Sequence, residues 1–316
     1  MQTPTRDDVL AAATRIADIV TRTPLLRSDA LDEATGARVW VKAENLQGGG
    51  AFKLRGAMSK ISALTADDRK NGVLAFSSGN HAIAVAMVAK YFGIPAVIAM
   101  PGDAPLAKAN KVRALGAEII AYDRVRDDRD AIFTQLARDR ALPLVKPFDD
   151  PLVMAGQGTI GLEIAAEIVP DIVLAGASGG GLAGGIAIAL PDARVFAVEP
   201  EGHDDLARSL AKGEIVANAP GVRSICDALM ADKPSTLTFA VAQRHLAGAI
   251  TASDETAKRA MRFAFQELKL VLEPSGALAL GALLDGAVDA RRKTVVVVAS
   301  GGNVDAAQFA RIIDAQ

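Results

Sequence analysis

The chain has 316 residues, 50% of them hydrophobic, so it can bury the core of one or two globular domains. Its 35 basic and 37 acidic residues leave a net charge of −2, which gives no field that favours nucleic acid or an anionic membrane. The single cysteine, Cys226, cannot form an internal disulfide, and no apolar run approaches the roughly 20 residues that span a bilayer. Because its start lacks a signal-peptide pattern, we expect a cytoplasmic protein that acts on small molecules.

Short apolar runs alternate with helix-period segments along the chain. The runs are rich in Val, Ile and Ala without polar alternation, which indicates strands covered by helices on both faces. The order strand, helix, strand is typical of a doubly wound α/β fold with parallel sheets. The predicted strands cover residues 37–44, 72–78, 95–101, 117–123, 171–177, 193–200 and 293–300.

Neither a repeat nor a Pro-rich or Ser-rich linker divides the chain. Any second domain is therefore formed by chain that crosses from one unit into the other and back. We expect a smaller α/β domain over residues 46–147, and a larger α/β domain formed by residues 1–45 and 148–316.

Open parallel sheets bind ligands where the carboxyl ends of strands lead into helices. Unusual residues follow the predicted strands at four such places. They are "AFKLRGA" (51–57), "SSGNHA" (77–82), "SGGGLAGG" (178–185) and "SGGN" (300–303).

The first of these places holds Lys53 between Phe52 and Leu54. An ammonium group among apolar side chains loses hydration, which lowers its pKa and frees the amine for Schiff-base chemistry. The alternative is a surface lysine at the start of a helix, with its charged end in water.

The glycines after residue 177 expose backbone N–H groups beside a helix N-terminus, where a phosphate would fit. Gly179, Gly181 and Gly184 also satisfy G-x-G-x-x-G, and Glu199 follows at the spacing of a dinucleotide fingerprint. An NAD-binding protein is therefore one alternative, and close packing of a helix is another.

A phosphate loop, a lysine, and hydroxyl or amide groups at neighbouring strand ends together suggest pyridoxal phosphate. The chain resembles the fold-type II pyridoxal-phosphate enzymes of the serine/threonine dehydratase and serine racemase family. The resemblance implies a tryptophan synthase β-like fold with the cofactor between two doubly wound parallel-sheet domains. Its motifs run in order: "KAENLQ", "AFKLRGA", "SSGNHA", "GQGTIGLEI", "SGGGL", "VEP", "EPSGA" and "SGGNVD".

The resemblance assigns roles residue by residue. Lys53 would form the Schiff base with the cofactor and later move the Cα proton, while Phe52 packs against the cofactor ring. Asn80 would bond the 3-hydroxyl group of the cofactor, and Ser300 would face the pyridine nitrogen. The phosphate is expected on Ser178, Gly179, Gly180, Gly181 and Leu182.

The "SSGNH" loop is expected to bind the substrate carboxylate through Ser77, Ser78, Asn80 and His81, together with N–H groups of a helix N-terminus. In racemases of the family, the serine at position 78 faces the side of the cofactor opposite the lysine. Ser78 therefore permits racemisation as well as elimination. Alternatively, Ser77 and Ser78 cap the following helix, and His81 is only a residue at its start.

A metal site is suggested by "VEPEGHDD". Glu199 and Asp205, with the backbone carbonyl of His203, match the divalent-ion loop of the family and suit Mg²⁺ or Ca²⁺. The alternative is that Asp204 or Asp205 caps the helix that follows.

The resemblance predicts a pyridoxal-phosphate dependent ammonia-lyase that removes water and then ammonia from threonine, serine or 3-hydroxyaspartate. Serine racemisation is the alternative within the family, and an NAD-binding oxidoreductase or a non-catalytic metabolite sensor is the alternative outside it. Ala228 stands where the family commonly has glycine after the aspartate, here Asp227, so a substrate other than ordinary threonine or serine is one alternative, and the sequence does not rank the three. A homodimer and the absence of a C-terminal regulatory domain are also expected.

Overall fold

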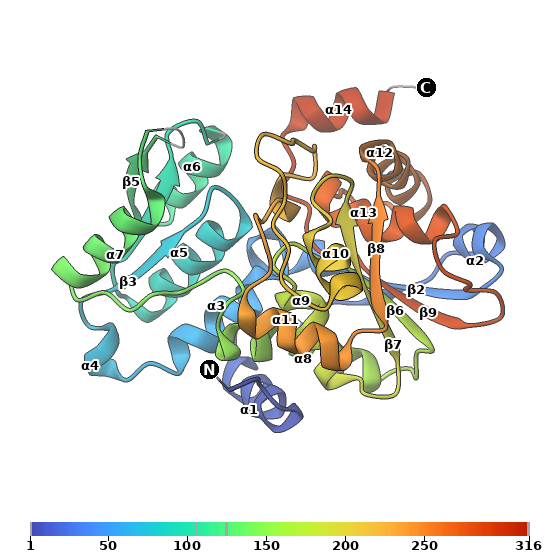
Figure 1. Cartoon of the computed structure of the whole chain (residues 1–316), viewed down its shortest axis with the longest axis horizontal. Coiled ribbons are helices and arrows are strands. Elements are labelled where there is room, and N and C mark those ends of the chain that lie inside the picture. Colours follow the sequence, from blue (N-terminus) through green and yellow to red (C-terminus); the bar gives the residue numbers. More distant parts are fainter. Residues whose placement is uncertain (1, 105, 124–125, 315–316) are drawn as a thin grey trace.

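The computed structural model describes residues 2–104, 106–123 and 126–314. It contains two sheets in separate parts of the molecule, with the smaller one at the left of Figure 1. The strand order is β1-β2-β9-β6-β7-β8 in the large sheet and β3-β4-β5 in the small sheet. Neighbouring strands are parallel except for β1 and β2, which pair antiparallel. The predicted α/β fold with two parallel sheets is confirmed.

Every predicted strand is present within a residue or two of its expected limits. The large sheet also contains two strands that the apolar runs did not reveal, β1 and β8. Both lie at its edges; β1 has only two residues, and β8 is mostly half-buried and contains glycine, alanine and threonine. The strands are β1 (Leu25–Leu26), β2 (Arg38–Lys42), β3 (Val73–Phe76), β4 (Ala96–Pro101), β5 (Glu118–Tyr122), β6 (Ile172–Gly176), β7 (Arg194–Pro200), β8 (Gly248–Ala252) and β9 (Thr294–Val298).

The helices cover both faces of the large sheet. The α-helices are α1 (Arg6–Ile16), α2 (Asp29–Thr35), α3 (Lys53–Ser62), α4 (Ala66–Arg69), α5 (Asn80–Phe92), α6 (Leu106–Ala114), α7 (Arg129–Asp139), α8 (Pro151–Ala165), α9 (Gly181–Ala189), α10 (Asp205–Lys212), α11 (Thr236–His245), α12 (Asp254–Phe263), α13 (Pro274–Leu284) and α14 (Ala306–Asp314). Short 3-10 turns η1 (Glu44–Leu46), η2 (Gly48–Gly50) and η3 (Asp227–Leu229), and a π-helical turn η4 (Ala264–Leu268), complete the fold. Among the described residues, no helix combines the length and apolar character needed to cross a membrane.

Strand β9 shows why the central strands read as continuous apolar runs. Its four valines are fully buried, because Val295 and Val297 belong to the core that contains α13, while Val296 and Val298 belong to the core that contains α9. Burial on both faces removes the polar alternation of a half-exposed strand.

Helix α3 connects the two parts of the molecule, since it packs against α8 beside the large sheet and against α5 beside the small one. Helix α8 in turn packs closely on α9, where a Cβ atom on Gly185 would lie 2.4 Å from the carbonyl oxygen of Met154. The close-packing role considered for the glycine-rich segment therefore applies to Gly185. The small sheet lies within residues 46–147, and the domain limits themselves stay a prediction.

Candidate active site

A cavity of about 230 Å³ lies between the two parts of the molecule, at the carboxyl ends of β3 and β6. The loop after β3 forms one wall, the glycine loop after β6 forms another, and the start of α3 closes the cavity between them. All residues predicted to bind cofactor or substrate line it: Phe52, Lys53, Ser77, Ser78, Asn80, His81, Ser178, Gly179, Gly180, Gly181, Leu182 and Ser300.

Lys53 is the first residue of α3, and its side chain faces the cavity. The preceding Phe52 is fixed by a hydrogen bond from its backbone N–H to the carbonyl oxygen of Ser300, 3.1 Å away. The Nζ atom of Lys53 donates to the carbonyl oxygen of Pro147 at 2.9 Å. Burial lowers the pKa of Lys53 to about 8, because the ammonium group loses hydration without gaining a carboxylate partner. The residue is thus an amine in a cavity and not a surface lysine.

The serine loop, Ser77 to Asn80, leads from β3 into α5. The Ser77 hydroxyl accepts a hydrogen bond from the Gly79 N–H at 3.0 Å, which tightens the turn before the helix. Gly79 is the N-cap residue, and no side chain caps this end of α5. The proposed capping role of Ser77 and Ser78 is therefore not seen, and the first N–H groups of a thirteen-residue helix face the cavity.

His81 lies in the first turn of α5 and is 2% exposed. Its Nε2–H group donates to the carbonyl oxygen of Val145 at 2.7 Å. Burial, together with the positive charge of Lys53, lowers the pKa of His81 to about 3. The imidazole is therefore neutral near pH 7, so any contribution it makes to anion binding does not come from a charge.

Asn80 is held at both ends of its amide. Its Nδ2 atom donates to Glu273 Oε1 at 2.5 Å, and its Oδ1 atom accepts from Asn303 Nδ2 at 2.9 Å. Glu273 is 2% exposed, its Oε2 atom has no hydrogen-bond partner, and burial raises its pKa to about 7. Glu273 stands in the "EPSGA" motif, but no local signal in the sequence shows that this carboxyl group is buried in the cavity wall.

The glycine loop ends at the N-terminus of α9, where no side chain caps the helix. A Cβ atom on Gly179 would lie 2.3 Å from the ring of Phe148, so glycine is needed for the loop to pass this side chain. The Ser178 hydroxyl accepts from the N–H of Ala231 at 3.0 Å, which ties the loop to the segment after η3. Exposed N–H groups at a helix N-terminus favour a phosphate.

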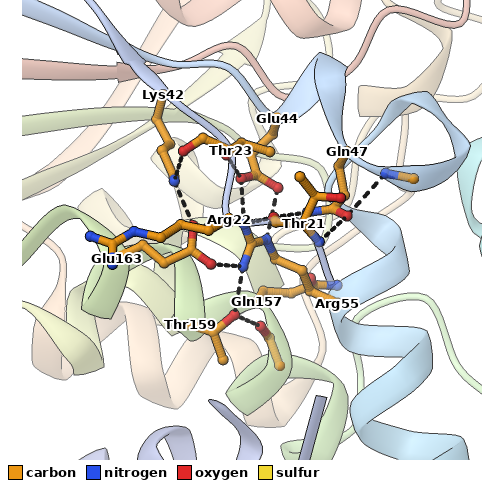
Figure 2. A network of polar contacts seen from close by, with 12 residues as sticks. Thr21, Arg22, Thr23, Lys42, Glu44, Gln47, Arg55, Gln157, Thr159 and Glu163 are labelled. Carbon is orange, nitrogen blue, oxygen red and sulfur yellow. Dashed lines mark hydrogen bonds and ion pairs between the residues drawn. The ribbon is translucent and has the colours of Figure 1, made fainter. Parts of the chain in front are cut away.

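A buried charged cluster surrounds Arg55 on α3, two residues after Lys53 in the sequence (Figure 2). Arg55, which is fully buried, donates from Nε and Nη2 to the two oxygens of Glu44 at 2.8 Å each. It also donates from Nη1 and Nη2 to Glu163 at 2.6 and 2.9 Å, and Glu163 accepts from Lys42 at 2.5 Å. The cluster therefore joins α3 to η1, β2 and α8.

The predicted metal residues do not line this cavity: Glu199 stands near the end of β7, His203 lies in the turn that follows, and Asp205 is the first residue of α10. The two oxygens of Glu199 accept from the N–H groups of Leu206 and Ala207 at 2.9 and 2.8 Å, so Glu199, and not Asp204 or Asp205, caps α10. Burial raises the pKa of Glu199 to about 8 and that of Asp205 to about 6. Asp205 Oδ2 is buried without a hydrogen-bond partner, as a metal ligand would be before the ion binds.

The Nε2 atom of the His203 ring bonds the carbonyl oxygen of Val222 at 3.1 Å, and the expectation that the imidazole takes no part in metal binding stays a prediction. In the described ranges, no three His, Cys, Asp or Glu side chains gather in a way that could hold a metal ion. The site expected here uses only two carboxylates and adds a backbone carbonyl.

Comparison with known proteins identifies the cofactor. The family model "Pyridoxal-phosphate dependent enzyme" matches residues 16–301. The L-threo-3-hydroxyaspartate ammonia-lyase of Saccharomyces cerevisiae is 40% identical over 99% of this chain and 97% of its own length, and the L-threonine ammonia-lyase of Thermotoga maritima is 38% identical over 98% and 78%. The solved structure of maize serine racemase superimposes with a TM-score of 0.93 at 35% identity, covering 98% of this chain and 97% of that one.

The chain belongs to the family of pyridoxal-phosphate dependent enzymes. The residues present fit this cofactor, since the cavity offers an amine with a lowered pKa, an uncapped helix N-terminus, and the buried Nε2 group of Gln157, which lacks a partner. When bound, pyridoxal phosphate withdraws electrons from the Cα atom of an amino acid. The NAD-binding alternative is wrong, because Glu199 caps α10 and does not line the cavity.

Proposed function

We propose that the protein is an ammonia-lyase that removes water and then ammonia from a β-hydroxy amino acid, leaving a 2-oxo acid. The observation that carries this proposal is the position of Lys53, in one cavity with the serine loop and the glycine loop. Support comes from full-length similarity to ammonia-lyases that act on hydroxyaspartate and threonine. Among these substrates, we propose 3-hydroxyaspartate, because Ala228 departs from the family pattern and the yeast relative is named for that substrate.

Lys53 would bind the cofactor covalently and then, as a free amine, take the proton from Cα. Its lowered pKa of about 8 supports this role, because roughly a tenth of the amine is then unprotonated at pH 7, far more than at its ordinary pKa of 10.5. Ser77, Asn80 and the first N–H groups of α5 would hold the α-carboxylate of the substrate, with Ser78 and His81 beside them. This arrangement directs the Cα–H bond toward the amine.

The glycine loop would hold the phosphate through the N–H groups of Gly179, Gly180 and Gly181, with Ser178 and Leu182 beside them. Phe52 would pack against the cofactor ring, and one Nδ2–H of Asn80 would reach its 3-hydroxyl group. Ser300 would face the pyridine nitrogen. Because a serine hydroxyl is neutral, it does not enforce protonation of the nitrogen, which favours prompt loss of the β-hydroxyl group.

The proposal is tested by product release. Purified protein with bound cofactor is incubated with L-threo-3-hydroxyaspartate, L-threonine and L-serine, and 2-oxo acid and ammonia are measured in equal amounts. The Lys53→Ala variant, with its folding checked by circular dichroism, serves as the control and should release neither product. Absence of both products from all three substrates with the unmodified protein would contradict the proposal.

Racemisation is the second candidate activity, supported by the position of Ser78 in the same cavity as Lys53 and by the similarity to maize serine racemase. Ser78 would deliver a proton to the face of Cα opposite the lysine. The Ser78→Ala variant should lose racemisation of L-serine, as measured by chiral chromatography, while it still eliminates water and ammonia from L-substrates. Normal racemisation by this variant would refute the role of Ser78.

We also propose that Glu199, Asp205 and the carbonyl group of His203 hold Mg²⁺ or Ca²⁺ and that the ion stabilises the turn before α10. Two buried carboxyl groups with raised pKa values support a cation there, because burial disfavours the ionised form of both, and the nearby Asp205 further disfavours ionisation of Glu199. Addition of Mg²⁺ or Ca²⁺ should raise the melting temperature of the protein, and the gain should vanish in Asp205→Asn.

The homodimer expected from the sequence is supported by exposed apolar side chains on adjoining loops. Leu46 is 51% exposed and Val271 is 44% exposed, and the neighbouring Asn45 side chain bonds the carbonyl oxygen of Val271. A monomer mass by light scattering at micromolar concentration would contradict this assignment. The cytoplasmic location stays a prediction, to be tested by cell fractionation.

A further inference from the structure

A lysine outside every motif stands at the mouth of the cavity. Lys108, on α6, pairs with Asp227 at the start of η3, with its Nζ atom 2.6 Å from Asp227 Oδ2. The two residues are 119 positions apart in the sequence and belong to opposite sides of the cavity. Both residues line the cavity that holds Lys53.

The ammonium group of Lys108 lies beside the serine loop. A Cβ atom placed on Gly79 would be 3.9 Å from Lys108 Nζ, so this cation adjoins the proposed site of the α-carboxylate. The other basic side chains of the described cavity wall are Lys53, which is committed to the cofactor, and His81, which is neutral. Lys108 is therefore the basic side chain that a second acidic group of a substrate would meet.

The ion pair is asymmetric in its exposure to solvent. The side chain of Lys108 is 13% exposed, whereas that of Asp227 is 47% exposed. An exposed carboxylate regains hydration when it loses its partner, but a largely buried ammonium group does not. An anion that enters the cavity can therefore replace Asp227 as the partner of Lys108 at low cost, while Asp227 turns toward water.

We propose that Lys108 binds the side-chain carboxylate of a dicarboxylic amino acid, with Asp227 as the counter-ion that the substrate displaces. The inference rests on the proposed function and names its substrate class: a β-hydroxy amino acid with a second carboxylate. Serine and threonine lack the group that would displace Asp227, so the Lys108–Asp227 pair stays closed when they bind. Selection thus depends on replacing one carboxylate with another at the same cation.

Ligand binding tests this inference without any elimination. L-Aspartate and L-alanine differ by the second carboxylate and both lack the β-hydroxyl group, so their dissociation constants are measured by calorimetry on the protein with cofactor bound. Unmodified protein should bind L-aspartate more tightly than L-alanine. Lys108→Met should weaken L-aspartate binding about 30-fold and change L-alanine binding less than about 3-fold. Arg113→Met, an exposed position on the same helix, is the matched control and should change neither.

The Asp227→Asn variant distinguishes two roles of the ion pair: Lys108 binds the substrate, or the pair only holds the two sides of the cavity together. If Lys108 binds the substrate, removing its counter-ion should leave L-aspartate binding at least as tight as in unmodified protein. If the pair only holds the cavity closed, Asp227→Asn and Lys108→Met should weaken both ligands alike, and the proposal is wrong. Lys108→Arg, which keeps the positive charge, should retain most of the preference for L-aspartate. It is the control that distinguishes loss of the charge from a folding defect in Lys108→Met. If the protein binds L-aspartate preferentially but releases no 2-oxo acid from L-threo-3-hydroxyaspartate, L-threonine or L-serine, this inference is supported and the proposed lyase activity is refuted.

Discussion

Replacing Arg55 with methionine is expected to lower the free energy of unfolding by about 3–5 kcal/mol, because the change removes one partner of a buried ion cluster. Arg55 and Glu44 are both fully buried, and the side chain of Glu163 is 18% exposed. Methionine fills most of the volume of the Arg55 side chain but leaves the Glu44 carboxylate without a cationic partner. The cost comes from this uncompensated charge, since a complete buried pair contributes little relative to apolar residues.

The assay is chemical denaturation of the protein without cofactor, followed by circular dichroism at pH 7. Arg22→Met is the matched control, because Arg22 pairs with Glu167 at the surface, where the two side chains are 56% and 40% exposed. An exposed pair is worth about 0–1 kcal/mol, so this variant should unfold close to the unmodified protein.

A second substitution tests the cause of the loss. Glu44→Gln removes the unpaired carboxylate. It should therefore lower the free energy of unfolding by about 0.5–3 kcal/mol less in the Arg55→Met background than in the unmodified protein. The explanation is refuted if Arg55→Met and Arg22→Met differ by less than about 1 kcal/mol, or if the effects of Arg55→Met and Glu44→Gln simply add.

Three further predictions concern single residues, and each is checked by measuring the free energy of unfolding of the protein without cofactor. Lys53→Met should stabilise it by up to about 3 kcal/mol at pH 7, because burial lowers the pKa of Lys53 from 10.5 to about 8; the gain should shrink above pH 8 as the amine loses its proton. Glu273 has its pKa raised from 4.5 to about 7, so its ionisation destabilises the fold as pH rises through this range. The unfolding free energy of Glu273→Gln relative to the unmodified protein should therefore increase by about 3 kcal/mol between pH 4 and pH 8, and no change would contradict the burial of this carboxyl group. Gly185→Ala should cost about 1–3 kcal/mol by separating α8 from α9, and an unchanged stability would refute their close packing.

The parts of the site that follow strand ends were predictable from the sequence. Lys53, Asn80 and the glycine loop after residue 177 stand where apolar runs give way to turns, and turns at the carboxyl ends of parallel strands are where such folds bind ligands. Eight motifs in order also identified the family before any geometry was known.

The remaining features depend on contacts that no local pattern contains. Lys108 belongs to an ordinary helix without a motif, and its pairing with Asp227 exists only once the two sides of the cavity meet. Glu273 stands in a visible motif, yet its burial and its bond to Asn80 arise from tertiary packing. Strand β8 was missed because its residues, Gly248–Ala252, include one glycine, two alanines and a threonine and so do not form a run of bulky apolar side chains.

We expect Lys53 to carry the cofactor of this enzyme. This role is tested most directly by borohydride reduction of the protein with cofactor bound, followed by digestion and mass spectrometry of the peptides. The peptide that contains Lys53 should carry a pyridoxyl-phosphate adduct, and the visible absorbance band should be lost. An adduct on a different lysine, with Lys53 unmodified, would contradict this role.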